Sequence, residues 1–255
     1  MAEDKNEDLA EGTLLSHLVE LRTRLFWIFG AVFLVFLALL PFSKMIFNYV
    51  AEPLVRVVPN GELLALSPVS PLTATIGLTF YIALFTAMPI VLYQVWAFIA
   101  PGLYKKEKHF AFPLFATSVV LFFVGMAFAY YVVFPLIFGF VSTFTPDTVN
   151  YQPDMTQYVS FVMMVVLVFG LAFETPIATV LLVMTGITTR EKLGKARPYV
   201  FLGAFIVGML LTPPDIISQT MLAIPVYLLY EMGILMCRFV RRSENDVAED
   251  ESNSV

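Results

Sequence analysis

The sequence predicts an all-α integral membrane protein with six transmembrane helices and both termini in the cytoplasm. Two observations predict this class. The chain is 59% hydrophobic and only 14% charged, whereas soluble domains carry about 25% charged residues. Thirteen of the fifteen Lys and Arg residues lie in alternate gaps between long apolar segments. Basic residues accumulate on the cytoplasmic side of a membrane because they are costly to translocate.

The positions of the basic clusters set the number of spans. The clusters lie at the N-terminus, in the second loop, in the fourth loop and at the C-terminus, whereas the third and fifth loops contain no Lys or Arg. Their members are Lys5, Arg22 and Arg24; Lys105, Lys106 and Lys108; Arg190, Lys192, Lys195 and Arg197; and Arg238, Arg241 and Arg242. Six is the only even number of spans that places all four clusters on one side.

The apolar segments divide the chain into three parts. We expect a cytoplasmic tail with a short interfacial amphipathic helix over residues 1–24, because leucines recur there at helical spacing. A membrane domain over 25–239 and an acidic cytoplasmic tail over 240–255 follow. The predicted spans are 25–40, 72–98, 112–138, 158–184, 198–211 and 216–239.

Prolines predict where these spans bend or end. The fourth span would be ~40 Å long against ~30 Å of hydrocarbon, so we expect a kink at Pro176. Pro89 predicts a second kink, in the second span. Between Pro198 and Thr212 only ~14 residues, or ~21 Å, remain for a short fifth span. Within the first loop, which runs to Pro71, the stretch 45–58 is expected to form a short structured cap on the periplasmic surface.

Few residues can carry chemistry inside the membrane. Glu174 lies near the middle of the fourth span, where a carboxylate costs roughly 2.5–3.5 kcal/mol on insertion scales. It is either a contact point for a polar group of a substrate or partner, or a protonated side chain bonded to a neighbouring helix. Glu231, in the last span, is explained by pairing with Arg238 or by snorkelling.

Two carboxylates lie on the side that is otherwise basic. Glu20 can pair with Arg24 four residues later, and Glu107 lies among the lysines of the second loop. Each alone is typical of a surface ion pair. Together they suit a ligand with two guanidinium groups, because Arg forms bidentate, charge-assisted bonds with carboxylates.

Composition argues against several functions. One cysteine, Cys237, and two histidines do not suggest a metal centre or an internal disulfide. No Gly-rich phosphate-binding loop is visible, and both histidines lie outside the spans, away from any intramembrane serine. We therefore predict no enzymatic activity, no cofactor and no nucleic-acid partner.

Three segments together resemble the TatC family, the multispanning subunit of the twin-arginine protein translocase. They are His17–Arg22, Tyr93–Glu107 and Gly208–Asp215. The resemblance covers residues from about 14 to 240. It implies a glove-like bundle with a concave face and short fifth and sixth spans, in the cytoplasmic (inner) membrane. It also implies a receptor for twin-arginine signal peptides of folded cargo, working with TatA and TatB, multimeric with TatB, and driven by the proton gradient.

The resemblance also implies roles for single residues of the receptor. Glu20 and Glu107 match the carboxylates that bind the arginine pair, while Arg22 and Phe98 match residues near that site. Glu174 matches the family's membrane-embedded acid on the concave face.

Further matched positions concern partners and loops. Met209, Thr212 and Gln219 fall where the family docks the single helix of TatB or TatA. Pro53 matches a position in the periplasmic cap, and Asp215 one that follows the fifth span.

Three other functions are compatible with a six-span bundle. A proton-coupled small-molecule transporter could use Glu174 as its relay, but it would need more polar residues at mid-membrane. An intramembrane enzyme lacks a base or metal ligands in its spans. A structural scaffold leaves the two cytoplasmic carboxylates without a reason.

Overall fold

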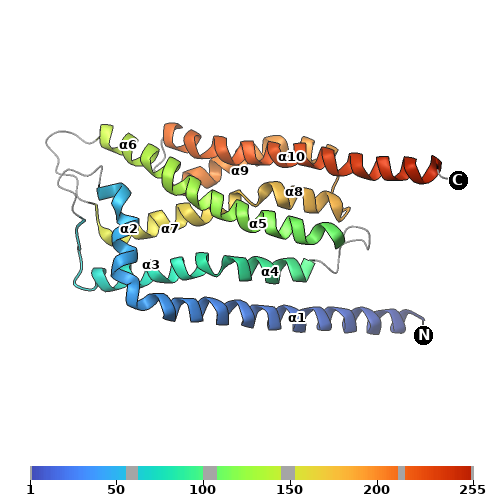
Figure 1. The fold of residues 1–255 in the computed structure, drawn as a ribbon, viewed down its shortest axis with the longest axis horizontal. Helices are drawn as coiled ribbons and strands as arrows, with labels where there is room; N and C mark the ends of the chain where they lie inside the picture. The colour runs from blue at the N-terminus through green and yellow to red at the C-terminus, as the bar shows by residue number, and fades with distance from the viewer. Residues whose placement is uncertain (1, 56–62, 100–107, 145–152, 212–215, 254–255) are drawn as a thin grey trace.

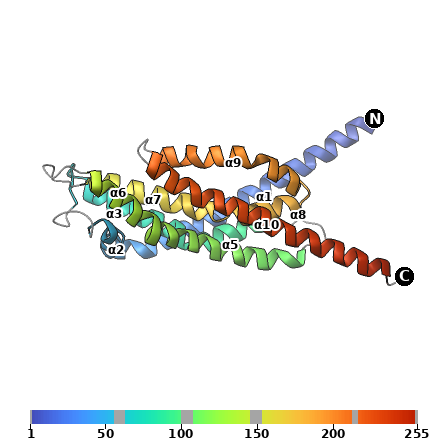
Figure 2. The same ribbon diagram turned by 90° about the horizontal axis from the view of Figure 1, so that it is seen from above.

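The computed structural model describes residues 2–55, 63–99, 108–144, 153–211 and 216–253, and this part of the chain is almost entirely helical. Its long helices run roughly parallel to one another in an elongated bundle (Figure 1). Both termini lie at one end of the bundle, and helix α2 crosses the other end (Figures 1 and 2). Two extended residues, Leu64 and Asp154, form an isolated bridge near that end.

The helices follow one another with short breaks. They are α1 (Ala2–Leu39), α2 (Ser43–Val55), α3 (Ser70–Thr86), α4 (Met88–Ile99), α5 (Lys108–Phe128), a π-helical segment (Ala129–Val133), α6 (Phe134–Phe144), α7 (Met155–Ala172), α8 (Thr175–Met184), α9 (Arg190–Leu211) and α10 (Ile216–Asn253).

The spans predicted from the sequence are present. Within the described ranges, five helical stretches are long and apolar enough to cross a membrane. The pair α3 and α4, bent by 48°, provides a sixth span if it is counted as one. The predicted all-α membrane protein with six spans is therefore confirmed. Many large apolar side chains are exposed, as on α1, where Trp27 and Phe33 are 66% and 61% accessible.

Two of the predicted proline kinks are confirmed. Pro89 lies in the first turn of α4, directly after the bend that follows α3. Pro176 lies in the first turn of α8, and the helix is interrupted at Phe173 and Glu174. Because proline has no N–H to donate, the break lets Glu174 begin a new helix, whose first bond runs from Ala178 N to the Glu174 carbonyl.

Two helices begin earlier than the predicted spans. α1 is one helix from Ala2, so the interfacial helix predicted within residues 1–24 and the first span form one continuous helix. α9 begins at Arg190 and contains Pro198 in its interior, so the predicted start at Pro198 is wrong. The preceding residues are mostly good helix formers, and a proline bends a helix without having to end it.

The core lies between the central helices. Fully buried side chains of α3, α5 and α7 meet there, among them Leu78, Phe122 and Phe169. Two glycines permit close helix contacts. A Cβ at Gly125 of α5 would lie 2.6 Å from the Phe169 carbonyl oxygen, and one at Gly233 of α10 would lie 2.1 Å from Thr179 Oγ1. These contacts position α8, and with it the break at Glu174.

Candidate functional site

Glu20 connects α1 to α4 through an arginine. Arg24 donates through Nε to Glu20 Oε1 at 3.1 Å, and its Nη2 also contacts that oxygen. Its Nη1 donates to the backbone carbonyl of Gln94 on α4 at 3.4 Å. The expected pair at four-residue spacing is therefore confirmed. The Glu20 side chain remains 38% exposed, so its carboxylate is accessible.

The end of α4 lies on the same side of the bundle as Glu20. Phe98, half-buried, follows Gln94 by one turn of α4 and belongs to the last turn of that helix. The predicted partner carboxylate, Glu107, lies outside the described residues, and α5 begins at the next residue, Lys108. Glu20 and the last turn of α4 thus lie towards the same end of the bundle. There the segment that contains Glu107 connects α4 to α5.

Arg22 points away from this group. It lies two positions after Glu20, and such positions on a helix do not face each other. Its guanidinium lies 5.6 Å from the centroid of the Phe26 ring. Together with Trp27 it borders a shallow hollow of about 450 Å³ on the outer surface of α1. The structure therefore does not bring Arg22 together with Glu20.

Glu174 occupies the break between α7 and α8. Ser118 of α5, which is 1% exposed, donates through Oγ to Glu174 Oε2 at 2.5 Å. The other oxygen, Oε1, is buried and has no hydrogen-bond partner among the residues that the structure describes. The sequence interpretation missed Ser118, although a serine in an apolar span was a visible signal. The carboxyl group can therefore accept or donate one more hydrogen bond.

The positions predicted for partner docking lie on α9 and α10. Met209 is 51% exposed on α9. Gln219 of α10 is half-buried and donates through Nε2 to the Phe205 carbonyl at 2.7 Å. Its side chain packs on Gly208, where a Cβ would lie 3.1 Å from Gln219 Cγ. Gln219 therefore ties α10 to α9 at Phe205 and Gly208.

For three of the predicted positions the structure gives no side-chain contacts. Thr212 and Asp215 lie outside the described residues. Pro53 lies in the backbone of α2, at the end of the bundle opposite the termini (Figure 1), but its side chain is not among those described.

Glu231 pairs with a different residue from the one predicted. Arg197 of α9 donates to both of its oxygens, through Nε at 2.7 Å and Nη2 at 2.8 Å. The Tyr227 hydroxyl donates to Oε1 at 2.9 Å. Of the two explanations that the sequence offers for Glu231, pairing and snorkelling, pairing holds, but with Arg197 in place of Arg238, because α9 extends through Pro198 and carries Arg197 alongside α10. The error in the α9 boundary hid this pair.

The apolar spans and the few buried polar groups described above define the class: this is a multi-pass helical membrane protein. Among the described residues no group of three or more His, Cys, Asp or Glu side chains could hold a metal ion.

Comparison with known proteins gives the family. The family profile described as "Sec-independent protein translocase protein (TatC)" matches residues 16–225. The TatC protein of Escherichia coli strain K12 is 50% identical over 227 residues, which cover 89% of this chain and 88% of that protein. The TatC protein of Azotobacter chroococcum mcd 1 is 48% identical over 248 residues, which cover 97% and 96%.

Comparison with solved structures indicates the same family. The crystal structure of a "Twin Arginine Translocase Receptor- TatC" is 37% identical, with a TM-score of 0.79, and the match covers 88% of this chain and 98% of that one. The chain belongs to the TatC family. It is a multi-pass membrane subunit of the Sec-independent protein translocase, a component of protein transport.

Proposed function

We propose that this chain is the signal-peptide receptor of a twin-arginine translocase, which exports folded proteins across the cytoplasmic membrane with the energy of the proton gradient. The observation that carries the proposal is the partly exposed Glu20 side chain, which Arg24 links to the Gln94 carbonyl about one turn before the end of α4. The segment that contains Glu107 connects the end of α4 to α5. In the proposed orientation this end of the bundle, with both termini, faces the cytoplasm.

The ion pair between Glu20 and Arg24 is weak enough for a ligand to replace Arg24. Arg24 neutralises the carboxylate, and such partly exposed pairs are worth only ~0–1 kcal/mol. An incoming guanidinium can therefore share or replace Arg24 at low cost and gain a bidentate, charge-assisted bond. While the ligand is bound, Arg24 can keep its hydrogen bond to the Gln94 carbonyl. Glu107 would receive the second arginine of the signal, with Phe98 providing an apolar surface next to the pair.

The remaining predicted residues extend the proposal along the membrane. The apolar part of the signal would follow the bundle towards Glu174, whose free oxygen Oε1 offers a polar contact at the helix break. Single helices of TatB or TatA would dock on α9 at Met209, with Gln219 and Thr212 forming a polar handle. Pro53 would belong to the periplasmic cap and Asp215 to the turn after α9.

A proton-coupled transporter of small molecules is a weaker candidate. Apart from Glu174, the buried hydroxyl groups that the structure describes belong to Ser70, Thr79, Ser118 and Thr179 and to two tyrosines, Tyr158 and Tyr230, which donate to the Val50 and Leu193 carbonyls. Ser118 is used by Glu174, and the threonines bond to carbonyls of their own helices. No chain of polar groups therefore leads to or from Glu174 within the described residues.

The experiment is photo-crosslinking of a twin-arginine signal peptide, with the reactive group next to its arginine pair, to membranes carrying this chain. Wild type is compared with Glu20→Ala, Glu107→Ala and the double variant. Glu191→Ala is the matched control, because Glu191 is an exposed carboxylate in the first turn of α9. Loss of hydrogen bonds to a charged group costs ~1.5–3 kcal/mol, so each single variant should bind roughly 10- to 100-fold more weakly.

Insertion of every variant is checked by carbonate extraction. Loss of crosslinks in the Glu20 and Glu107 variants, with normal crosslinks in Glu191→Ala, supports the receptor function. Unchanged crosslinks in all variants would show that both carboxylates are ordinary surface groups and that the arginine pair binds elsewhere.

A further inference from the structure

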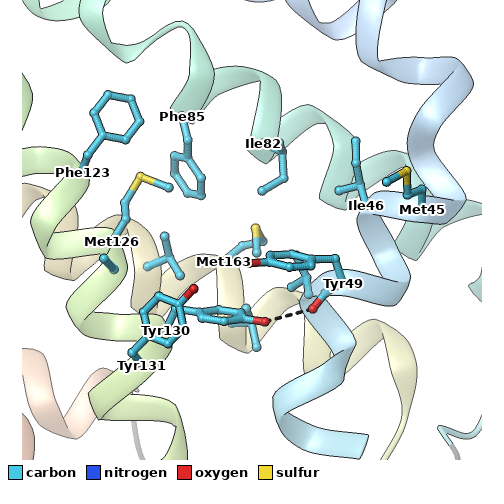
Figure 3. A pocket seen from close by; sticks show the side chains of 14 residues that line it. Met45, Ile46, Tyr49, Ile82, Phe85, Phe123, Met126, Tyr130, Tyr131 and Met163 are labelled. Carbon is cyan, nitrogen blue, oxygen red and sulfur yellow. Dashed lines mark hydrogen bonds between the residues drawn. The ribbon is translucent and has the colours of Figure 1, made fainter.

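A groove lies beneath α2, at the end of the bundle opposite the termini. It has a volume of about 500 Å³ and is enclosed by α2, α3, α5, the π-helical segment and α7. Its lining is almost entirely apolar (Figure 3). Buried side chains such as Phe85, Val162 and Met163 form its floor, whereas Met45 and Phe123, at its border, are exposed. The groove is therefore open to the surroundings of the bundle.

Tyrosines form the polar part of this groove. The Tyr130 hydroxyl donates to the Tyr49 carbonyl at 3.0 Å, and the two rings stack with centroids 5.8 Å apart (Figure 3). Tyrosine is enriched where a membrane meets water, because its ring is apolar and its hydroxyl polar. This cluster therefore marks the level of the lipid headgroups.

The groove extends from that level towards the middle of the membrane. Between Tyr131 and Phe123, which both line it, the chain rises ~12 Å at 1.5 Å per residue. One leaflet of the hydrocarbon core is ~15 Å thick, half of ~30 Å. The groove is thus as long as most of the depth of one leaflet, and we expect its open side to face lipid.

Size and polarity separate the possible occupants. A helix 12 Å long and ~10 Å in diameter fills roughly 900 Å³, more than the groove holds. An extended peptide would leave its N–H and C=O groups without partners against an apolar lining, at several kcal/mol each. A hydrocarbon chain has neither problem, and cavities of ~300–1,000 Å³ are the usual size for sites that enclose small ligands.

We propose that this groove is a binding site for one acyl chain of a membrane phospholipid, held under α2 with its ester end at the tyrosine cluster. The bound chain fills the space between α2 and the bundle. It would thereby support α2, which also packs on α3 and α6 and accepts hydrogen bonds from Tyr130 and Tyr158.

The test uses the full chain in liposomes with phosphatidylethanolamine that carries a diazirine in its acyl chain. After illumination, adducts are located by peptide mass spectrometry. We expect them to concentrate on groove residues such as Met126 and Met163. Ala127→Trp, which places a large side chain at an exposed wall position, should reduce the groove adducts at least fivefold. Val124→Trp is the matched control, since Val124 is exposed on the same helix but does not line the groove.

Two results would overturn the proposal. Adducts on wild type that spread evenly over exposed apolar residues, such as Val120 and Leu136, would show ordinary contact with bulk lipid. Displacement of the groove adducts by a twin-arginine signal peptide would assign the groove to the peptide. The wild-type distribution decides the matter even if Ala127→Trp fails to fold. Because no Glu20 contact is involved, the result is independent of the receptor function.

Discussion

Replacing Gly233 by alanine should separate α10 from α8. The added Cβ would lie 2.1 Å from Thr179 Oγ1 and 2.9 Å from Pro176 Cα. The threonine cannot simply rotate away at no cost, because it is β-branched and its hydroxyl donates to the Pro176 carbonyl at 2.8 Å. The proline atom belongs to the backbone. One of the two helices must therefore shift.

Overpacking of a well-packed core costs typically ~1–3 kcal/mol. For a chain of this size, 1 kcal/mol lowers Tm by roughly 2–4 °C, so Gly233→Ala should lower Tm by roughly 2–12 °C. The assay is thermal unfolding of the purified protein in detergent. The shift should also disturb Glu174, since it moves the first turn of α8, and signal-peptide crosslinks near mid-membrane should weaken.

Two comparisons make this prediction refutable. Gly30→Ala is the control, because no atom lies within 4 Å of a Cβ at that position, and alanine there should be neutral or stabilising by up to ~1 kcal/mol. Adding Thr179→Ala to Gly233→Ala should restore part of the lost Tm, since the 2.9 Å contact with Pro176 remains. A Gly233→Ala protein as stable as Gly30→Ala would refute the close α8–α10 contact.

Three further changes test single contacts. Ser118→Ala removes the hydroxyl that donates to Glu174; we expect a loss of ~1–3 kcal/mol, measured by thermal unfolding, and an unchanged Tm would contradict the bond. Asp154→Ala removes the side chain that caps α7 and should cost ~0.5–2 kcal/mol in the same assay, with Asp154→Asn as a milder control. Arg197→Lys keeps the charge but loses the bidentate bond to Glu231; its Tm should fall between wild type and Arg197→Ala, and equal Tm values for all three would contradict the pair.

The spans and the kinks could be predicted because they depend on local properties. Apolar length and charge asymmetry follow from the cost of burying charge in lipid. The break at Pro176 follows from a missing N–H and a bulky ring. The Glu20 pair with Arg24 follows from helix geometry alone, since side chains four positions apart are neighbours.

The contacts between helices could not be predicted in the same way. Ser118 and Glu174 are far apart in sequence and meet only because α5 packs on α7 and α8. The Arg197–Glu231 pair was missed for a more specific reason. Proline is typical of a helix start, so the sequence pattern places Arg197 in a loop before Pro198, whereas tertiary packing against α10 supports a helix that continues through the proline.

The position of Glu174 has a physical reason that connects fold and proposed function. In the middle of a regular span, a carboxyl group would face lipid or the apolar core. At the break before Pro176, Ser118 satisfies one oxygen and the other is left without a described partner. A buried polar group without a hydrogen-bond partner lowers stability. A ligand that donates a hydrogen bond to Glu174 Oε1 would remove this cost, which favours its binding. This supports the proposal that a polar group of a signal peptide or partner helix binds at Glu174, where the Gly233 contact holds α8 in place.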